Sequence, residues 1–205
     1  MKTIKRWAWI GLAFLMTCRP ALAGDVKRGV YFGLGAYTDL GYPSTLVLVG
    51  AQLDRDLGPV LLSADVNYSP TPKSGGPITF REASVVTTGD GYLKLGPALV
   101  GGGVSWSVTK EEGYFKGIVR PEAGAGIAFA PDGDVSIRLI GKRIFRVFDN
   151  FNALDGYVAE GRLDVPVKGS TAVRIGAKVF WLRFDDSAGQ RLSGRAMQAH
   201  FGVSF

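Results

Sequence analysis

The residues that most often perform acid–base or nucleophilic chemistry are scarce in this chain. Its 205 residues include one histidine, His200, and one cysteine, Cys18. Hydrolysis by a serine normally needs a histidine as general base. The nearest serine on the same face of an extended strand is Ser204, about 13 Å from His200 at the usual rise per residue. We therefore expect His200 to have a structural role, and the sequence predicts no catalytic residue and no enzyme activity.

Metal and cofactor sites have equally little support. One histidine and one cysteine cannot supply a zinc ligand set. The segments DGD (132–134) and DD (185–186) offer carboxylates but lack the ligand spacing of a calcium loop, so they are interpreted as turns. No glycine-rich phosphate motif precedes a helix. We expect neither a metal ion nor a cofactor.

The N-terminus has the three parts of a secretory signal peptide. A positive MKTIKR precedes the uncharged segment 7–18, which is shorter than the roughly 20 residues of a membrane-spanning helix. The small-residue pattern Ala-Leu-Ala then ends at Ala23, where we predict cleavage. Cys18 follows Met16 and Thr17 rather than a small residue, which disfavours a lipidated cysteine. Residues 1–23 are thus predicted to be the signal peptide and 24–205 one cysteine-free domain.

Removing this signal changes the charge balance. The whole chain carries 24 Lys and Arg against 18 Asp and Glu. Four of the basic residues lie in the signal, so 20 remain against 18 in the rest of the chain. No basic cluster with interleaved aromatic residues remains, and we expect no nucleic-acid partner.

Apolar residues recur at every second position through most of the domain. In segment 59–69, Val60, Leu62 and Val66 stand on one face, opposite Ser63 and Asp65. Segments 157–167 and 171–181 repeat this alternation, which is typical of strands with one apolar and one polar face. Short turn signals (56–58, 89–91, 131–134, 168–170) alternate with longer connections (38–44, 69–76, 109–113, 148–156, 185–193).

This spacing predicts an all-β protein with ten antiparallel strands. The expected strands are 29–38, 45–55, 59–69, 78–88, 92–108, 114–129, 134–147, 157–167, 171–184 and 194–205. Segment 78–88 has no clean apolar face because of Arg81 and Glu82, and Pro97 and Pro121 fall inside expected strands, where each removes a hydrogen-bond donor. Eight strands are therefore the alternative. The glycines at 101–103 are the expected bend, with a linker as the alternative.

Two architectures share this periodicity. A soluble sandwich or lipocalin-like barrel buries the apolar faces, whereas a transmembrane barrel turns them outward to lipid. Three observations favour the membrane: strands at or above the roughly 9–11 residues that cross a bilayer, one consistently short set of connections, and aromatics where the apolar faces meet the longer loops. Those aromatics are Tyr68, Trp106, Phe115 and Trp181.

The chain ends AHFGVSF, with Phe201, Val203 and Phe205 at alternate positions. This ending resembles the C-terminal strand of Gram-negative outer-membrane β-barrels. The resemblance implies an up-and-down barrel in the outer membrane, with lipid and the assembly machinery as partners and these three residues as the assembly signal. The C-terminal hairpin from Val173 to Phe205 also resembles YfaZ-type small barrels of unassigned function.

With the apolar faces outward, His200 and many charged side chains would face the lumen. The charged residues are Asp65, Lys116, Arg120, Glu122, Arg138, Lys142, Glu160, Arg162, Asp164, Arg174 and Lys178. In a narrow barrel side chains fill the interior, so we expect an ionic plug and a structural, surface or ligand-binding role. The surplus of basic residues leaves open a narrow anion-leaning channel. A lipid-modifying enzyme is a second alternative, although no histidine-x-serine motif of the lipid A deacylases is present. The sequence names no small-molecule ligand.

Overall fold

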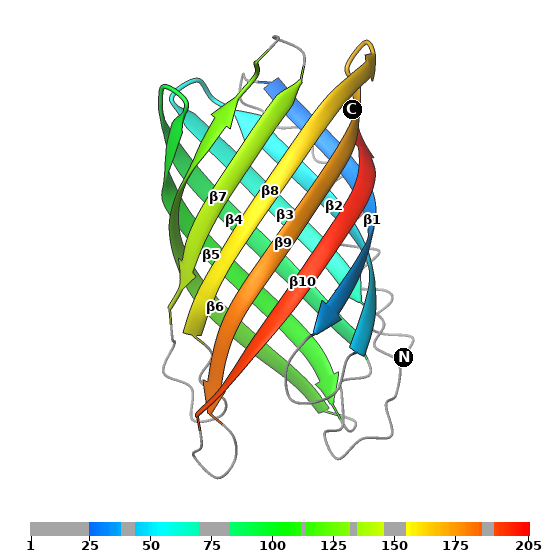
Figure 1. Cartoon of the computed structure of the whole chain (residues 1–205), viewed down its shortest axis with the longest axis vertical. Helices are drawn as coiled ribbons and strands as arrows, with labels where there is room; N and C mark the ends of the chain where they lie inside the picture. The colour runs from blue at the N-terminus through cyan, green and yellow to red at the C-terminus, as the bar shows by residue number, and fades with distance from the viewer. Residues whose placement is uncertain are drawn as a thin grey trace.

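The computed structural model describes residues 25–37, 44–69, 83–111, 114–131, 135–145, 155–185 and 191–205. Each consecutive pair of strands is antiparallel, and the first strand pairs with the last to close a ten-stranded barrel (Figure 1). The strands are β1 (Asp25–Tyr37), β2 (Ser44–Asp56), β3 (Val60–Ser69), β4 (Ala83–Leu95), β5 (Ala98–Glu111), β6 (Tyr114–Phe129), β7 (Ser136–Ile144), β8 (Asp155–Lys168), β9 (Thr171–Asp185) and β10 (Arg191–Ser204). The expected class and the count of ten are therefore confirmed. Within the described residues no helix is long and apolar enough to cross a membrane.

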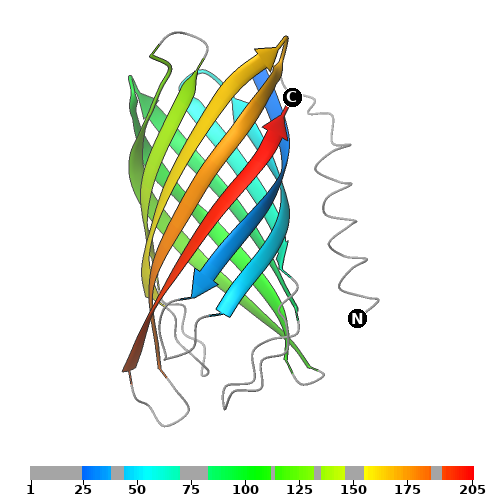
Figure 2. The ribbon, with the colours of Figure 1, turned by 45° about the vertical axis from the view of Figure 1, so that its right-hand side comes forward.

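Closure brings the two ends of the described chain together. The β1–β10 ladder runs from Gly29 opposite Ser204 to Tyr37 opposite Ala196. Beyond it, Arg28 and Phe205 exchange two backbone hydrogen bonds of 2.9 and 2.7 Å. Figure 2 shows β1 and β10 side by side along this seam. The last residue of the chain therefore belongs to the hydrogen-bonded wall.

The fourth and fifth strands differ from the prediction. The sequence GDG at 89–91 was expected to be a turn, but it lies inside β4, where Asp90 is paired with both Ser63 and Gly103. The turn comes instead at Gly96 and Pro97, and Gly96 has a φ of 64° that favours glycine. Turn-forming residues inside β4 remain extended because both neighbouring strands bond to them.

The structure also gives the outcome for the prolines, the glycines and the connection that were expected nearby. Pro97 lies in the turn, whereas Pro121 stays within β6, where its carbonyl accepts a hydrogen bond of 3.0 Å from the Phe145 amide. Residues 101–103 are part of β5, so they are not a linker. The longer connection expected at 109–113 is also wrong, because only residues 112–113 separate β5 from β6. The predicted signal peptide (1–23), Arg81 and Glu82, DGD (132–134), and Asp186 lie outside the described residues.

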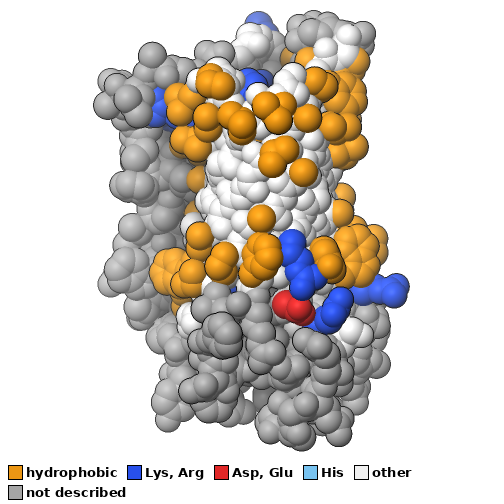
Figure 3. All heavy atoms as spheres, turned by 90° about the vertical axis from the view of Figure 1, so that its left-hand side faces the viewer, with side chains coloured by type: hydrophobic (Ala, Val, Ile, Leu, Met, Phe, Trp, Pro, Cys, Tyr) orange, Lys and Arg blue, Asp and Glu red, His pale blue; other side chains and the backbone are white. Residues whose placement is uncertain are grey.

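The apolar side chains point outward. Phe32, Trp106 and Phe201 are more than half exposed on the outside of the barrel, whereas Arg138 and Arg174 inside it are 4% and 1% exposed. Figure 3 shows hydrophobic side chains over one face of the described wall, gathered toward its two ends. This inverted pattern excludes the soluble alternative, in which the apolar faces would form the core. Among the expected aromatics, Trp106 and Trp181 are exposed, Tyr68 is half-buried, and the Phe115 side chain lies outside the described residues.

The two ends of the barrel are distinct. The termini of the described chain, Asp25 and Phe205, lie at the same end as the short turns 57–59, 96–97 and 169–170. The longer connections between β1 and β2, β3 and β4, β7 and β8, and β9 and β10 leave the opposite end. We call these the turn end and the loop end.

Candidate functional site

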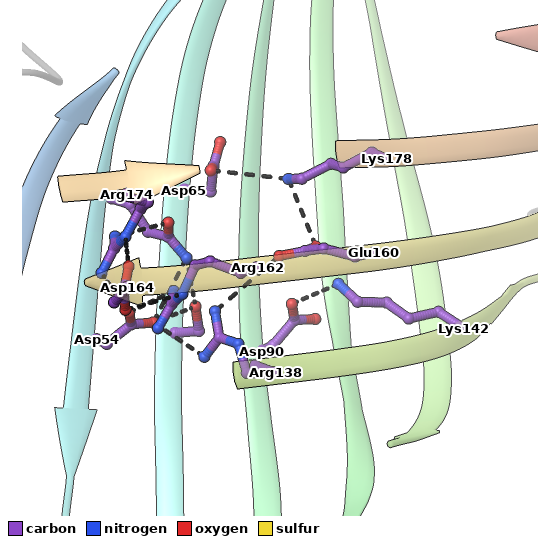
Figure 4. A network of polar contacts seen from close by, with 12 residues as sticks. Asp54, Asp65, Asp90, Arg138, Lys142, Glu160, Arg162, Asp164, Arg174 and Lys178 are labelled. Atoms are coloured by element: carbon purple, nitrogen blue, oxygen red, sulfur yellow. Dashed lines mark hydrogen bonds and ion pairs between the residues drawn. The ribbon is translucent and has the colours of Figure 1, made fainter. Parts of the chain in front are cut away.

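The interior of the barrel holds a network of charged side chains contributed by seven strands. Because side chains alternate across a strand, every second residue of β2, β3, β4 and β6–β9 points inward. Figure 4 shows these side chains converging in the lumen. The network consists of Asp54, Asp65, Asp90, Glu122, Arg138, Lys142, Glu160, Arg162, Asp164, Arg174 and Lys178.

Asp54 of β2 is the point at which three arginines meet. Its carboxylate lies 3.2 Å from Arg138, 2.6 Å from Arg162 and 3.5 Å from Arg174. The Ser63 hydroxyl of β3 donates a further hydrogen bond of 2.7 Å to it. The three arginines come from β7, β8 and β9, so Asp54 links strands that are distant in sequence and lie across the lumen.

A second carboxylate, Asp164 of β8, holds two of the same arginines. Arg174 donates to both of its oxygens, at 2.6 and 3.2 Å, a bidentate geometry that fixes the guanidinium plane. Arg162 lies 3.3 Å from Asp164, and the side-chain Oε1 of Gln52 accepts a hydrogen bond of 2.9 Å from Arg174. We call Asp54, Arg138, Arg162, Asp164 and Arg174 the arginine cluster.

The remaining network residues are organised around two lysines. Lys142 lies 2.5 Å from Asp90 and 3.2 Å from Glu122. Lys178 lies 3.7 Å from Asp65 and 3.6 Å from Glu160. We call these six residues the lysine cluster.

The two clusters form one network. Glu160 also lies 4.0 Å from Arg138, which joins the lysine cluster to the arginine cluster. The Tyr31 hydroxyl of β1 donates to Asp65 at 2.8 Å, so the first strand is tied in as well.

The network is close to neutral. It contains five basic and six acidic residues, with side chains that are 15% exposed or less. Burying so many charges costs several kcal/mol for each ion, and opposite charges at hydrogen-bond distance offset that cost only when the geometry is good. Each carboxylate here has a basic partner within 4.0 Å. The network is therefore a compensated unit, in which each removal leaves a buried charge.

Most of the predicted lumen residues belong to this network. Nine of them lie in it: Asp65, Glu122, Arg138, Lys142, Glu160, Arg162, Asp164, Arg174 and Lys178. Arg120 is half-buried on the same face of β6 as Glu122. The Lys116 side chain lies outside the described residues.

Asp54 and Asp90 were missed, although both face inward. Asp54 lies inside the expected strand 45–55, two residues before the turn signal 56–58, and Asp90 lies within GDG, which was assigned to a turn. Their alternation with inward-facing neighbours on β2 and β4 is the signal that would have found them. Because both are acidic, the predicted basic surplus inside the barrel is largely cancelled.

Little free space remains beside the network. The cavity bounded by Asp65, Asp90, Lys142, Glu160 and Lys178 has a volume of about 10 Å³, which is room for roughly one water molecule. Toward the turn end, Tyr92, Leu99 and Ile140 form a buried apolar cluster. At the level of the network the described side chains fill the lumen.

His200 is held by packing. Its ring lies 4.9 Å from that of Tyr31, centroid to centroid, and a Cβ at Gly176 would meet its Nε2 at 2.0 Å. Ser204 donates to the Ala172 carbonyl at 3.5 Å rather than to His200. Among the described residues no group of three or more His, Cys, Asp or Glu is placed to hold a metal ion.

The residues expected to form the assembly signal lie on the outside of β10 and at its end. Phe201, Val203 and Phe205 are 58%, 38% and 43% exposed, and they form one apolar stripe along the seam with β1.

Comparison with known proteins finds structural similarity to outer-membrane proteins at low sequence identity. No protein-family model and no curated protein matches this chain. Among solved structures, Neisserial surface protein A is 7% identical, with a TM-score of 0.47 over 89% of this chain and 98% of its own. The outer-membrane protease OmpT of Escherichia coli is 9% identical (TM-score 0.49, 90% and 98%). The translocator domain of autotransporter NalP from Neisseria meningitidis is 12% identical (TM-score 0.46, 100% and 95%).

Proposed function

We propose that this protein is a small outer-membrane β-barrel whose lumen is closed by its own ionic network. Its role is then structural, or is performed by the surface of the barrel and by ligands bound there, rather than by solute passage. The observation that carries this proposal is the compensated network of eleven buried charges, with a cavity of only about 10 Å³ beside it.

Membrane insertion is supported by the outward apolar faces. An open sheet cannot span a bilayer, because its edges would leave backbone groups without partners, whereas a closed barrel has no edge. The pairing of β1 with β10 meets this condition. The predicted signal peptide and the alternating C-terminal stretch ending at Phe205 support the outer membrane and its assembly machinery as the destination. The resemblance of the C-terminal hairpin to YfaZ-type barrels agrees with this destination and adds no ligand.

The proposal is tested by conductance. Protein extracted from the outer membrane of an expressing bacterium is reconstituted in a planar bilayer, after a gel of boiled and unboiled samples has shown two mobilities typical of a folded barrel. We expect the wild-type barrel to give no discrete steps. Loosening the arginine cluster with Arg174→Ala should produce intermittent openings, because it leaves Asp54 and Asp164 each short of a partner.

Two other results would overturn the proposal. Steady, anion-selective steps from the wild-type barrel, reduced by Arg120→Ala or Arg174→Ala, would indicate the narrow channel instead. A changed lipid A mass spectrum on expression, abolished by His200→Ala, would indicate a lipid-modifying enzyme. Charge balance disfavours the channel, since five basic residues face six acidic ones in the network.

A further inference from the structure

A row of aromatic and basic side chains crosses four strands on the outer surface of the barrel. In the strand registers Arg143 of β7 lies opposite Tyr157 of β8, Tyr157 opposite Trp181 of β9, and Trp181 opposite Arg195 of β10. Three strand spacings of about 4.8 Å place the two arginines roughly 14 Å apart. Arg183 of β9 stands one outward position closer to the loop end. These five residues are the arginine patch.

The arginine patch lies at one border of the apolar belt. Arg195 and Phe205 are both on the outward face of β10, ten residues apart in sequence. A strand rise of about 3.3 Å and a tilt near 40° turn this separation into about 25 Å of height, the height of the apolar band of outer-membrane barrels. Between the row and Phe205, Met197, Phe201 and Val203 are exposed apolar side chains.

The neighbouring strands repeat this distribution. Between this row and Val167, which lies near the turn end, the described outward residues of β7, β8 and β9 are all apolar or glycine. These residues are Ile137, Leu139, Gly141, Ala159, Gly161, Leu163, Val165, Val167, Val173, Ile175, Ala177 and Val179. Figure 3 shows Lys and Arg side chains, with an acidic side chain among them, grouped at the border of the hydrophobic side chains nearer the loop end. On these three strands the outward charge nearer the loop end therefore begins at the level where the hydrocarbon would end.

The arginine patch has more positive charge than its described neighbours neutralise. Arg143 pairs with Asp155 at 3.0 Å and lies 4.5 Å above the Tyr157 ring. Arg183 and Arg195 are exposed, and no carboxylate of the described residues forms an ion pair with either. Three arginines thus face one aspartate. Tyr157 and Trp181, both more than 40% exposed, lie between them at the level where aromatic rings favour the membrane interface.

We propose that the arginine patch binds the phosphate groups of lipid A, the lipid anchor of lipopolysaccharide in the outer leaflet. The inference rests on the membrane orientation of the proposed function, with the turn end in the periplasm and the loop end outside. Arginine presents a rigid fork of donors that matches a phosphate. The two exposed arginines lack a carboxylate among the described residues, and a phosphorylated headgroup at this depth supplies the missing anion while its acyl chains lie against the belt.

The test compares two double variants that each lose two positive charges. Arg183→Gln with Arg195→Gln removes the two uncompensated cations of the arginine patch. Lys27→Gln with Lys168→Gln removes two exposed cations near the turn end and serves as the matched control. Each protein is extracted from the outer membrane, exchanged into zwitterionic detergent and titrated with bisphosphorylated or dephosphorylated lipid A. Binding is measured by native mass spectrometry and by Trp181 fluorescence in a Trp106→Phe background.

A basic residue near a charged membrane surface contributes roughly fivefold to binding, so the patch variant should bind bisphosphorylated lipid A about 30-fold more weakly. The control should bind like the wild type, and dephosphorylated lipid A should bind weakly to all three. The inference would be overturned if the patch variant bound bisphosphorylated lipid A as tightly as the wild type does. It would also be overturned if the control variant lost as much affinity as the patch variant, or if the wild type bound both forms of lipid A equally well. If the barrel still shows two gel mobilities and no conductance steps, any of these results would refute the lipid site alone. The proposed function would then remain intact.

Discussion

Removing the Asp54 carboxylate tests whether the ionic network holds the barrel together. The variant Asp54→Ala takes away the anion that three arginines share. Arg162 and Arg174 keep Asp164, but Arg138 keeps only Glu160, at 4.0 Å. The Arg138 guanidinium then stays buried with one distant partner. The arginine cluster retains three positive groups and one negative group.

The magnitude follows from this loss of compensation. Removing one partner of a buried ion pair costs about 3–5 kcal/mol, because the other charge stays buried. Asp54 is 4% exposed, so water cannot take its place without entering the lumen. With a urea dependence of about 2 kcal/mol per M, the unfolding midpoint should fall by about 2 M. The isosteric Asp54→Asn should fall less, because its carbonyl can still accept the Ser63 hydrogen bond.

The assay is urea unfolding of the purified barrel in lipid vesicles, with the folded fraction measured by gel mobility without boiling. Asp56→Ala is the control, since Asp56 also pairs with a basic residue, Lys94 at 2.7 Å, but the two side chains are 45% and 31% exposed. Exposed pairs contribute about 0–1 kcal/mol, so its midpoint should move by less than about 0.5 M. Equal midpoints for Asp54→Ala and the wild type would refute the view that the network is a compensated structural unit.

Three further predictions concern the seam and the outer surface. Gly176→Ala should destabilise the barrel by about 1–3 kcal/mol through overpacking, because its Cβ would meet His200; adding His200→Ala should restore the urea midpoint if that contact is the cause. Phe205→Ala should lower the fraction of chains that reach the folded gel position in cells, and an unchanged fraction would argue against a role in assembly. Trp106 and Trp181, exposed on the outside, should be quenched by brominated phospholipid and protected from aqueous iodide, whereas the reverse would contradict a lipid-facing belt.

The period-two pattern and the spacing of turn signals predicted the class and the strand count, because both are local properties of the chain. The outward apolar faces were predicted from strand length, the short connections and the positions of the aromatic residues. The boundary of β4, in contrast, is determined by pairing with other strands. Glycine and aspartate at 89–91 favour a turn in isolation, but hydrogen bonds from β3 and β5 keep them extended. This one error removed Asp90 from the predicted lumen, whereas Asp54 was missed although it lies within the expected strand 45–55. The sequence prediction includes all five basic residues of the network and four of its six acidic ones. Which carboxylate meets which cation depends on the residues that the closed wall brings face to face.

The alternation that places Arg174 and Lys178 inside the wall also affects how the chain reaches its destination. On the proposed route to the outer membrane, β9 crosses the inner membrane, and each of these two cations adds about 2.5–3.5 kcal/mol to the cost of inserting there as a helix. We therefore expect β9 to pass through that membrane without stopping. If the proposed destination is right, the side chains that brace the barrel also disfavour retention in the inner membrane, and replacing both with apolar residues should increase that retention.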